Sequence, residues 1–128
     1  MLERADQPHF WQSVTGSREC LNEALLATAQ REVLEETGIK AGLADLHDWQ
    51  RQNQYLIYPH WRHRYAPDVT HNLESVFGLC VPADTPVCLA PREHTRFQWL
   101  AWPQAADLAF SCSNAAAIRW LPHFLESL

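Results

Sequence analysis

Gly16-Ser-Arg-Glu-Cys-Leu-Asn-Glu23, followed after seven residues by Arg31-Glu-Val-Leu-Glu-Glu-Thr-Gly38-Ile39, is the stretch on which the fold prediction depends. From Leu21 to Thr37 the hydrophobic pattern is helical, because apolar side chains recur at every fourth position from Leu25 on. No proline or glycine interrupts this segment, and Gly38 can adopt the left-handed conformation that ends many helices. The sequence therefore predicts one helix over residues 21–37.

Three carboxylates of this predicted helix, Glu32, Glu35 and Glu36, lie at positions i, i+3 and i+4. At about 100° per residue they share one face, within about 100° of arc. That face overlaps the apolar stripe of Leu25, where carboxylates repel and their pKa values rise unless a cation neutralises them. A hard divalent metal such as Mg²⁺, shared with substrate phosphates, would do so. The alternative is an ordinary surface ion pair between Arg31 and Glu35, worth about 0.3–0.5 kcal/mol.

The other elements are predicted from hydrophobic alternation and from chain breakers. Three strand-like segments are expected at residues 43–57, 75–81 and 97–102, with the polar, histidine-rich stretch 59–72 between the first two. Residues 114–125 are predicted to form a second helix, with Ser113 or Asn114 as its N-cap. Strands interleaved with two helices predict an α/β sandwich with a mixed sheet, in a single domain over residues 1–128.

Composition places the chain among globular proteins. Of its 128 residues 47% are hydrophobic, including six Trp and five Phe, which disordered chains do not carry. The 10 Lys and Arg against 15 Asp and Glu give a formal net charge of -5, so neither nucleic acid nor a membrane surface is expected as a partner. No apolar run approaches about 20 residues. The four cysteines lack CxxC spacing, which predicts reduced thiols and a cytoplasmic location.

The stretch 16–39 resembles the box that characterises the Nudix hydrolases: a glycine, a spacer, a glutamate, seven residues, then R-E-apolar-x-E-E-x-G-apolar. Residues 23–39 match without a gap, whereas six residues separate Gly16 from Glu23 where the pattern has five. We place the additional residue in the loop near Cys20, because loops tolerate changes in length. The resemblance implies a loop, helix and loop that hold Mg²⁺, with Mn²⁺ as a substitute, against a diphosphate that water cleaves.

Motifs outside the box resemble one Nudix subfamily, the bacterial dihydroneopterin triphosphate pyrophosphatases of folate synthesis. These motifs are Phe10-Trp-Gln-Ser-Val-Thr-Gly-Ser17, Arg62-His-Arg-Tyr-Ala-Pro67, Glu93-His94 before Trp99-Leu100, and Ser111 to Asn114. The resemblance implies a small-molecule triphosphate substrate, 7,8-dihydroneopterin triphosphate, which would lose pyrophosphate and leave the monophosphate. It also implies a Nudix-type α/β/α sandwich. The N-terminal strands are expected to be missing, because relatives begin with a strand before the position of Met1, and the exposed edge would favour a homo-oligomer.

The same resemblance assigns site residues position by position. Glu32 and Glu36 become metal ligands, and Glu35 becomes a further ligand or a water-orienting group. Glu93 matches a loop carboxylate that completes the metal site and is a candidate general base, with an ordinary exposed acid as the alternative. Substrate contacts are expected at Arg4, Thr15, Tyr55, Leu56, Ile57, Tyr58 and Ser111.

Several of these assignments have a plain structural alternative. Leu56 and Ile57 fit core packing as well as ligand contact. The basic run Arg62–Arg64 fits a phosphate clamp and a solvated turn equally well. The seven histidines show no metal-ligand spacing, so no zinc site is expected.

Two other functions stay open at this point. A general nucleoside triphosphate pyrophosphatase acting on substrates such as dATP differs from a pterin enzyme in pocket shape, which the sequence does not decide. A non-catalytic Nudix binding module is suggested by the lengthened loop and the expected loss of strands. Release of pyrophosphate with Mg²⁺, compared with EDTA, separates an enzyme from a binding module.

Overall fold

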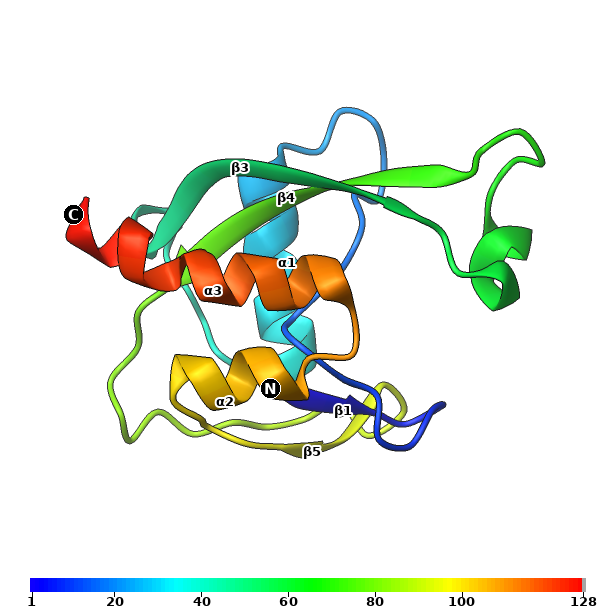
Figure 1. Ribbon diagram of the computed structural model, residues 1–128. Coiled ribbons are helices and arrows are strands. Elements are labelled where there is room, and N and C mark those ends of the chain that lie inside the picture. Colours follow the sequence, from blue (N-terminus) through cyan, green and yellow to red (C-terminus); the bar gives the residue numbers. More distant parts are fainter. Residues whose placement is uncertain (128) are drawn as a thin grey trace.

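The structure is a computed structural model that describes residues 1–127; Leu128, the last residue of the predicted domain, lies outside the described residues. The strands are β1 (Leu2–Arg4), β2 (Trp11–Gln12), β3 (Leu46–Leu56), β4 (His71–Leu79) and β5 (His94–Phe97). The helices are α1 (Leu25–Thr37), α2 (Trp102–Leu108) and α3 (Cys112–Glu126), with short 3₁₀ turns η1 (Leu43–Asp45) and η2 (Pro59–Arg64) (Figure 1).

The two long strands β3 and β4 form an antiparallel ribbon that packs against helices. Leu46 pairs with Leu79 at one end and Leu56 with His71 at the other, and η2 continues from the far end of the ribbon. β3 contacts both α1 and α3, and Figure 1 shows α1 passing behind the ribbon while α3 lies nearer the viewer. The ribbon is therefore one layer of a helix–sheet arrangement.

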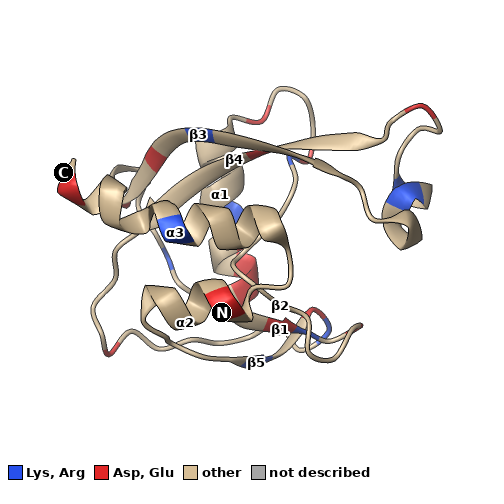
Figure 2. Ribbon diagram, in the orientation of Figure 1, with Lys and Arg blue, Asp and Glu red and all other residues tan. Residues whose placement is uncertain are grey.

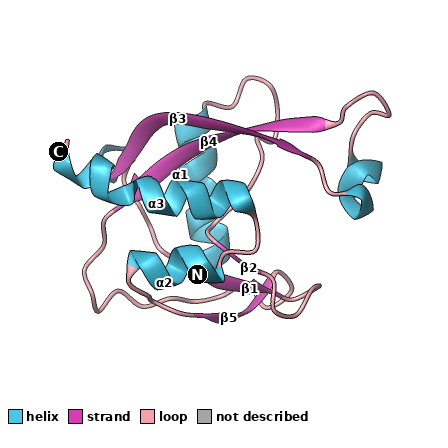
Figure 3. Ribbon diagram, in the orientation of Figure 1, coloured by secondary structure: helices cyan, strands magenta, loops and turns pink. Residues whose placement is uncertain are grey.

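A second, smaller sheet places β1 between β2 and β5, with antiparallel pairing on both sides. Glu3 of β1 accepts hydrogen bonds from Arg96 of β5 at 2.8 and 3.0 Å, which links the two strands through side chains. Trp11 makes a parallel bridge to Ala109, so β2 is joined to the end of α2, which packs on α3 (Figure 3). Sheets and helices in alternating layers confirm the predicted α/β sandwich class.

Helix α1 ends where the sequence predicts and begins four residues later. Gly38 has a φ of 73°, and its N–H donates to the Leu34 carbonyl at 2.9 Å, which closes the helix in the left-handed conformation. At the other end, residues 21–24 are a turn, because the Glu23 carboxylate accepts the Glu19 N–H at 3.0 Å and so holds the chain in a loop. The predicted start at Leu21 is therefore wrong.

Helix α1 also buries polar side chains in place of the expected apolar stripe. Its buried residues are Thr28, Glu36 and Thr37, whereas Leu25 and Leu34 are 42% and 45% exposed. The prediction that Leu25 marks the buried face is wrong. The face turned toward the small sheet is polar, which is unusual for a packed helix and indicates a functional reason.

Two boundaries near the C-terminus differ from the prediction. The expected strand 97–102 is wrong beyond Phe97, where β5 ends. Trp102 begins α2, and Pro103 lies in its first turn. Backbone N–H groups of a first turn have no partner within the helix, so the missing N–H of proline costs no hydrogen bond there. Helix α3 begins at Cys112, earlier than predicted. Its N-cap is Ser111, whose hydroxyl accepts the Asn114 N–H at 3.0 Å.

Surface properties agree with the composition. Figure 2 shows basic and acidic residues spread over most elements, and Arg62 and Arg64 belong to η2. The four cysteines are free and exposed. Across residues 1–127 no helix combines the length and the apolar character that a membrane span requires.

Candidate active site

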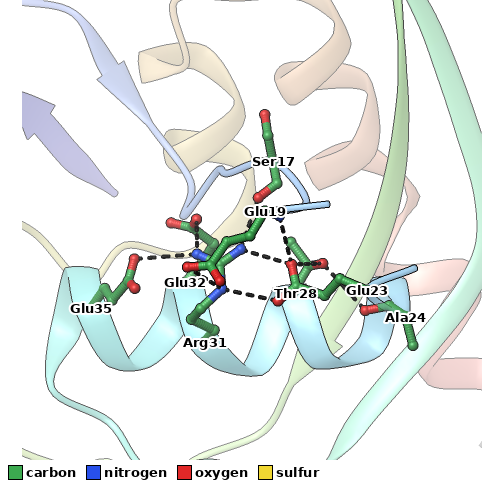
Figure 4. Close-up of polar contacts among 8 residues, drawn as sticks. All are labelled: Ser17, Glu19, Glu23, Ala24, Thr28, Arg31, Glu32 and Glu35. Atoms are coloured by element: carbon green, nitrogen blue, oxygen red, sulfur yellow. Dashed lines mark hydrogen bonds and ion pairs between the residues drawn. The ribbon is translucent and has the colours of Figure 1, made fainter. Parts of the chain in front are cut away.

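Arg31 is the centre of the polar contacts at the beginning of α1 (Figure 4). Its guanidinium donates to Glu23 at 2.9 and 3.2 Å and to Glu32 at 2.7 Å. It also donates to the Ser17 carbonyl at 2.8 Å, and reaches Glu35 at 3.5 Å. The surface pair expected between Arg31 and Glu35 is thus the longest of these contacts. The shorter ones tie the loop before α1 to the helix.

Glu23 is held as an anion by this network. Hydrogen bonds from Arg31 and then from Thr28, whose hydroxyl lies 2.7 Å away, lower the pKa of Glu23 to about 2. The loop that Glu23 closes contains the additional residue of the box. Cys20 and Leu21, near which the additional residue is predicted, lie in its exposed turn, where Leu21 is 87% exposed.

Gly16 and Glu32 are in close contact across the same loop. A Cβ atom at Gly16 would lie 2.1 Å from Cδ of Glu32, so a larger residue there would displace the Glu32 side chain. The loop backbone therefore runs directly against the carboxylate that the sequence assigns to a metal. With Arg31 bound to its Oε1 at 2.7 Å, Glu32 is 15% exposed.

Glu36 lies one turn further along the helix and is buried, with 2% of its surface exposed. Within residues 1–127 neither of its carboxylate oxygens has a hydrogen-bond partner. Burial first, and then the negative charges of Glu32 and Glu93, raise the pKa of Glu36 to about 9; the backbone of Thr15 acts in the opposite direction. The helix thus aims an unpaired carboxyl at a region where two other carboxylates and Thr15 converge.

Glu93 occupies the loop directly before β5 and is exposed. Its carbonyl accepts the Ala5 N–H at 2.8 Å, which fixes the loop to the end of β1. This exposure fits the alternative that Glu93 is an ordinary loop acid. Its negative charge nevertheless raises the pKa of Glu36. The negative charges of Glu32 and Glu93 therefore both act on the buried carboxyl of Glu36. Glu35 is 49% exposed, and its carboxylate lies 3.5 Å from the same Arg31 nitrogen that binds Glu32.

These carboxylates fit a hard divalent cation in chemistry. Oxygen donors at high charge density are what Mg²⁺ requires, and a buried carboxylate without a partner calls for a positive charge. As the described side chains stand, no three or more His, Cys, Asp or Glu residues are close enough to form a metal site. Arg31 holds Glu32 in its place, so a cation would compete with this guanidinium.

Two residues that the sequence analysis did not single out complete the buried part of the site. His94 opens β5 and is 4% exposed in its side chain, with Nδ1 at 3.6 Å from Oε1 of Glu36. Its Nε2 lies 3.1 Å from Nε2 of Gln12 on β2. The available signals were the Glu93-His94 and Trp11-Gln12 motifs. Neither spacing nor periodicity showed that their side chains meet.

Two expected substrate contacts, Arg4 and Tyr58, lie in an aromatic cluster. The Arg4 guanidinium sits over the rings of Trp61 and Phe10, at 4.7 and 5.7 Å from their centroids, and pairs with Asp6 at 2.8 Å. The ring of Phe10 also contacts Tyr58, at 6.4 Å between centroids. A planar cation beside partly open aromatic rings is suited to a planar, anionic ligand.

The remaining expected contacts have separate places. Ser111 caps α3, and Tyr55 accepts a hydrogen bond from Asn72 at 3.2 Å across the β3–β4 ribbon. Leu56 is 61% exposed, whereas Ile57 is 3% exposed and belongs to the core. The basic run Arg62–Arg64 is exposed on η2, as the solvated-turn reading expects.

Comparisons with known proteins agree with this architecture. The NUDIX domain family model matches residues 1–123. A dihydroneopterin triphosphate diphosphatase of Escherichia coli is 47% identical over 121 residues, 93% of this chain and 79% of that protein. A protein of the same name from Haemophilus influenzae is 38% identical over 93% of this chain and 75% of that protein.

The comparison with solved structures agrees with the sequence comparison. The structure of the E. coli dihydroneopterin triphosphate pyrophosphohydrolase superposes with a TM-score of 0.82 at 46% identity, and the match covers 92% of this chain and 80% of that one. Since the family model spans nearly all of the chain and the box carboxylates are present in sequence and in space, this chain belongs to the NUDIX domain family.

Proposed function

We propose that this chain is a metal-dependent hydrolase that releases pyrophosphate from 7,8-dihydroneopterin triphosphate and leaves the monophosphate. The observation that carries the substrate assignment is 47% identity, over 93% of the chain, to a protein named for that reaction. The convergence of Glu32, Glu36 and Glu93 supports the hydrolytic chemistry, because phosphoanhydride cleavage depends mainly on positioning and on charge stabilisation.

Glu32, Glu36 and Glu93 are the residues that would hold the cation, Mg²⁺ or Mn²⁺. When bound, it would acidify water and offset the charge on the leaving phosphate. Metal binding requires that Glu36 give up its proton, since its pKa is raised to about 9 without a cation. Glu35, which is half-exposed and reaches Arg31 at 3.5 Å, is assigned the smaller role of orienting water.

The chain's own groups handle the proton and the phosphates. Glu93 is exposed and lies in a loop fixed by the Ala5 N–H, and we assign to its carboxylate the role of accepting a proton from the attacking water. Arg4 supplies a guanidinium and Thr15 a hydroxyl for substrate phosphate or ring polar atoms. Tyr58, which lies in the aromatic cluster with Arg4, is the other residue that we assign to the substrate. The substrate contacts at Tyr55, Leu56, Ile57 and Ser111 stay predictions from the resemblance.

The deciding experiment is a competition in one tube between 7,8-dihydroneopterin triphosphate, dATP and GTP, with pyrophosphate measured with Mg²⁺ or with EDTA. We expect the pterin triphosphate to have the highest kcat/KM and EDTA to abolish turnover. A preference for a purine nucleotide rejects the pterin assignment and keeps the hydrolase. Absence of turnover on every triphosphate, by a folded protein with Mg²⁺, rejects the enzyme and favours a binding module.

A further inference from the structure

A buried polar contact links three elements at the edge of the proposed metal site. Gln12 of β2 is 8% exposed, His94 of β5 is 3% exposed and Glu36 of α1 is 2% exposed. The His94 ring lies between the other two, with Nε2 at 3.1 Å from the Gln12 amide nitrogen and Nδ1 at 3.6 Å from Oε1 of Glu36. Three polar side chains buried together are costly unless they are arranged for one another.

The contact with Gln12 fixes where the imidazole carries its proton. The amide nitrogen of Gln12 can only donate, so the His94 Nε2 that faces it must accept. In a neutral imidazole the proton is then on Nδ1, and that N–H points to the Glu36 carboxylate. The reverse arrangement, with the Gln12 carbonyl facing Nε2, would turn the lone pair of Nδ1 toward Glu36. A carboxylate can only accept, so once Glu36 is deprotonated, as a bound cation requires, both neighbours of the ring fit the Nδ1–H tautomer.

The backbone around His94 is fixed as firmly as the ring. His94 pairs with Arg4 of β1, and its N–H donates to the Ala90 carbonyl at 2.9 Å. The preceding residue is Glu93, whose carbonyl accepts the Ala5 N–H. Because Glu93 and His94 are consecutive, the ring that reaches α1 and the loop carboxylate are attached to the same hydrogen-bonded stretch of backbone.

We propose that Gln12 and His94 are positioning residues: Gln12 holds His94 in its Nδ1–H tautomer, and His94 orients Glu36 toward the cation that it would share with Glu93. This inference rests on the proposed metal-dependent function. The 3.6 Å separation is slightly long for a hydrogen bond, and a small rotation of Glu36 closes it, as polar contacts in active sites do when a ligand binds. Partners behind the ligands of a metal commonly change its affinity by about 10- to 100-fold.

A matched pair of variants separates positioning from packing. In His94→Asn the amide nitrogen takes the place of Nδ1 and keeps a donor toward Glu36. In His94→Leu the volume is filled and the donor is lost. We expect direct titration with Mn²⁺, followed by electron paramagnetic resonance, to show about 10- to 100-fold weaker binding for His94→Leu. For His94→Asn we expect binding within about threefold of the parent. Equal Mn²⁺ affinity of the two variants overturns the proposal.

The tautomer is tested on the unchanged protein, so the proposal does not depend on whether a variant folds. Nitrogen-15 labelling of histidine, with spectra at about pH 8 where imidazole is ordinarily neutral, distinguishes Nδ1–H from Nε2–H. We expect the Nδ1–H pattern for His94 and a changed pattern in Gln12→Glu, because a carboxylate accepts a proton from Nε2. An Nε2–H pattern in the parent overturns the proposal.

The same measurements separate this inference from the proposed function. If the parent binds Mn²⁺ and His94→Leu binds it weakly, while pyrophosphate is not released from 7,8-dihydroneopterin triphosphate, the substrate assignment fails and the positioning role stands. If the folded parent binds no Mn²⁺ at all, the positioning role fails, because Glu36 and Glu93 then share no cation.

Discussion

The two ends of the α1 region place the same type of side chain in opposite environments. Before the helix, Glu23 receives hydrogen bonds from Arg31 and Thr28, which lower its pKa to about 2. Near the end of the helix, Glu36 is buried without a hydrogen-bond partner among residues 1–127, and its pKa is raised to about 9. Two glutamates of one motif thus have different charge states at neutral pH. Their surroundings decide this, since their chemistry is the same.

Glu23 therefore contributes to stability, whereas Glu36 is available for function. Arg31 and Glu23 satisfy each other and hold the loop that carries Gly16 against the helix. Glu36 is destabilising as it stands, because a buried carboxyl must keep its proton or find a cation. Strain of this kind is retained where a site needs it. We therefore expect substitutions at the two ends to affect different measurements.

The largest effect is expected at Glu36. Glu36→Gln keeps the shape of the side chain but removes the charge that a cation needs, and it should lower turnover by about 10²-fold or more. Glu35→Gln, on the exposed side of the same helix, is the matched control and should lose less than about tenfold. Pyrophosphate release at saturating Mg²⁺ measures both. Turnover of Glu36→Gln within twofold of the parent removes Glu36 from the metal site.

The next effect is expected at Arg31. Arg31→Ala leaves Glu23 and Glu32 without their cation, and should lower the midpoint of urea unfolding. Arg31→Lys keeps the charge but cannot bond Glu23 through two nitrogens, so an intermediate loss is expected. If the lysine variant is as stable as the parent, charge alone holds the loop and the hydrogen-bond geometry does not matter.

The pH dependence of stability should have opposite signs at the two glutamates. The lowered pKa of Glu23 means that its contribution is complete above its ordinary value of 4.5 and disappears as the pH falls toward 2. The raised pKa of Glu36 means that the unfolded chain loses this proton first, so metal-free stability falls as the pH rises from 4.5 toward 9.

Glu23→Gln should therefore be less stable than the parent at pH 7 and equal to it near pH 2. Glu36→Gln should be more stable than the metal-free parent, by a margin that grows between pH 5 and pH 9. Urea unfolding in EDTA across this pH range tests both variants. If the stability of Glu23→Gln and of Glu36→Gln, each relative to the parent, changes with pH in the same direction, the two glutamates do not have opposite pKa shifts.

The smallest effect is expected far from α1. Ser111→Ala removes the hydroxyl that caps α3 through the Asn114 N–H, and should cost about 1 kcal/mol in thermal unfolding. Mn²⁺ affinity should stay unchanged, because Ser111 contacts neither end of α1. Weaker Mn²⁺ binding in Ser111→Ala would show that a general loss of stability weakens the metal site. A loss of Mn²⁺ binding on substitution of Glu36 would then not be specific to Glu36.

Much of the fold follows from local patterns. The end of α1 was predicted at the correct residue, because a glycine with positive φ leaves a clear signal. The beginning of α1 was not, since a loop held by the Glu23 side chain has the same hydrophobic pattern as a first helical turn. Helix α2 was missed for a similar reason: Trp99 to Trp102 is apolar and short, and such runs fit strand and helix alike.

The sequence by itself determined the family, the helix that carries Glu32, Glu35 and Glu36, and the loop that takes up the additional residue, because these are local and periodic features. The tertiary structure decided which carboxylate is buried, which is held by Arg31, and that His94 and Gln12 meet Glu36. The physical reason is that burial and hydrogen bonding depend on residues up to 82 positions apart, which no local pattern records.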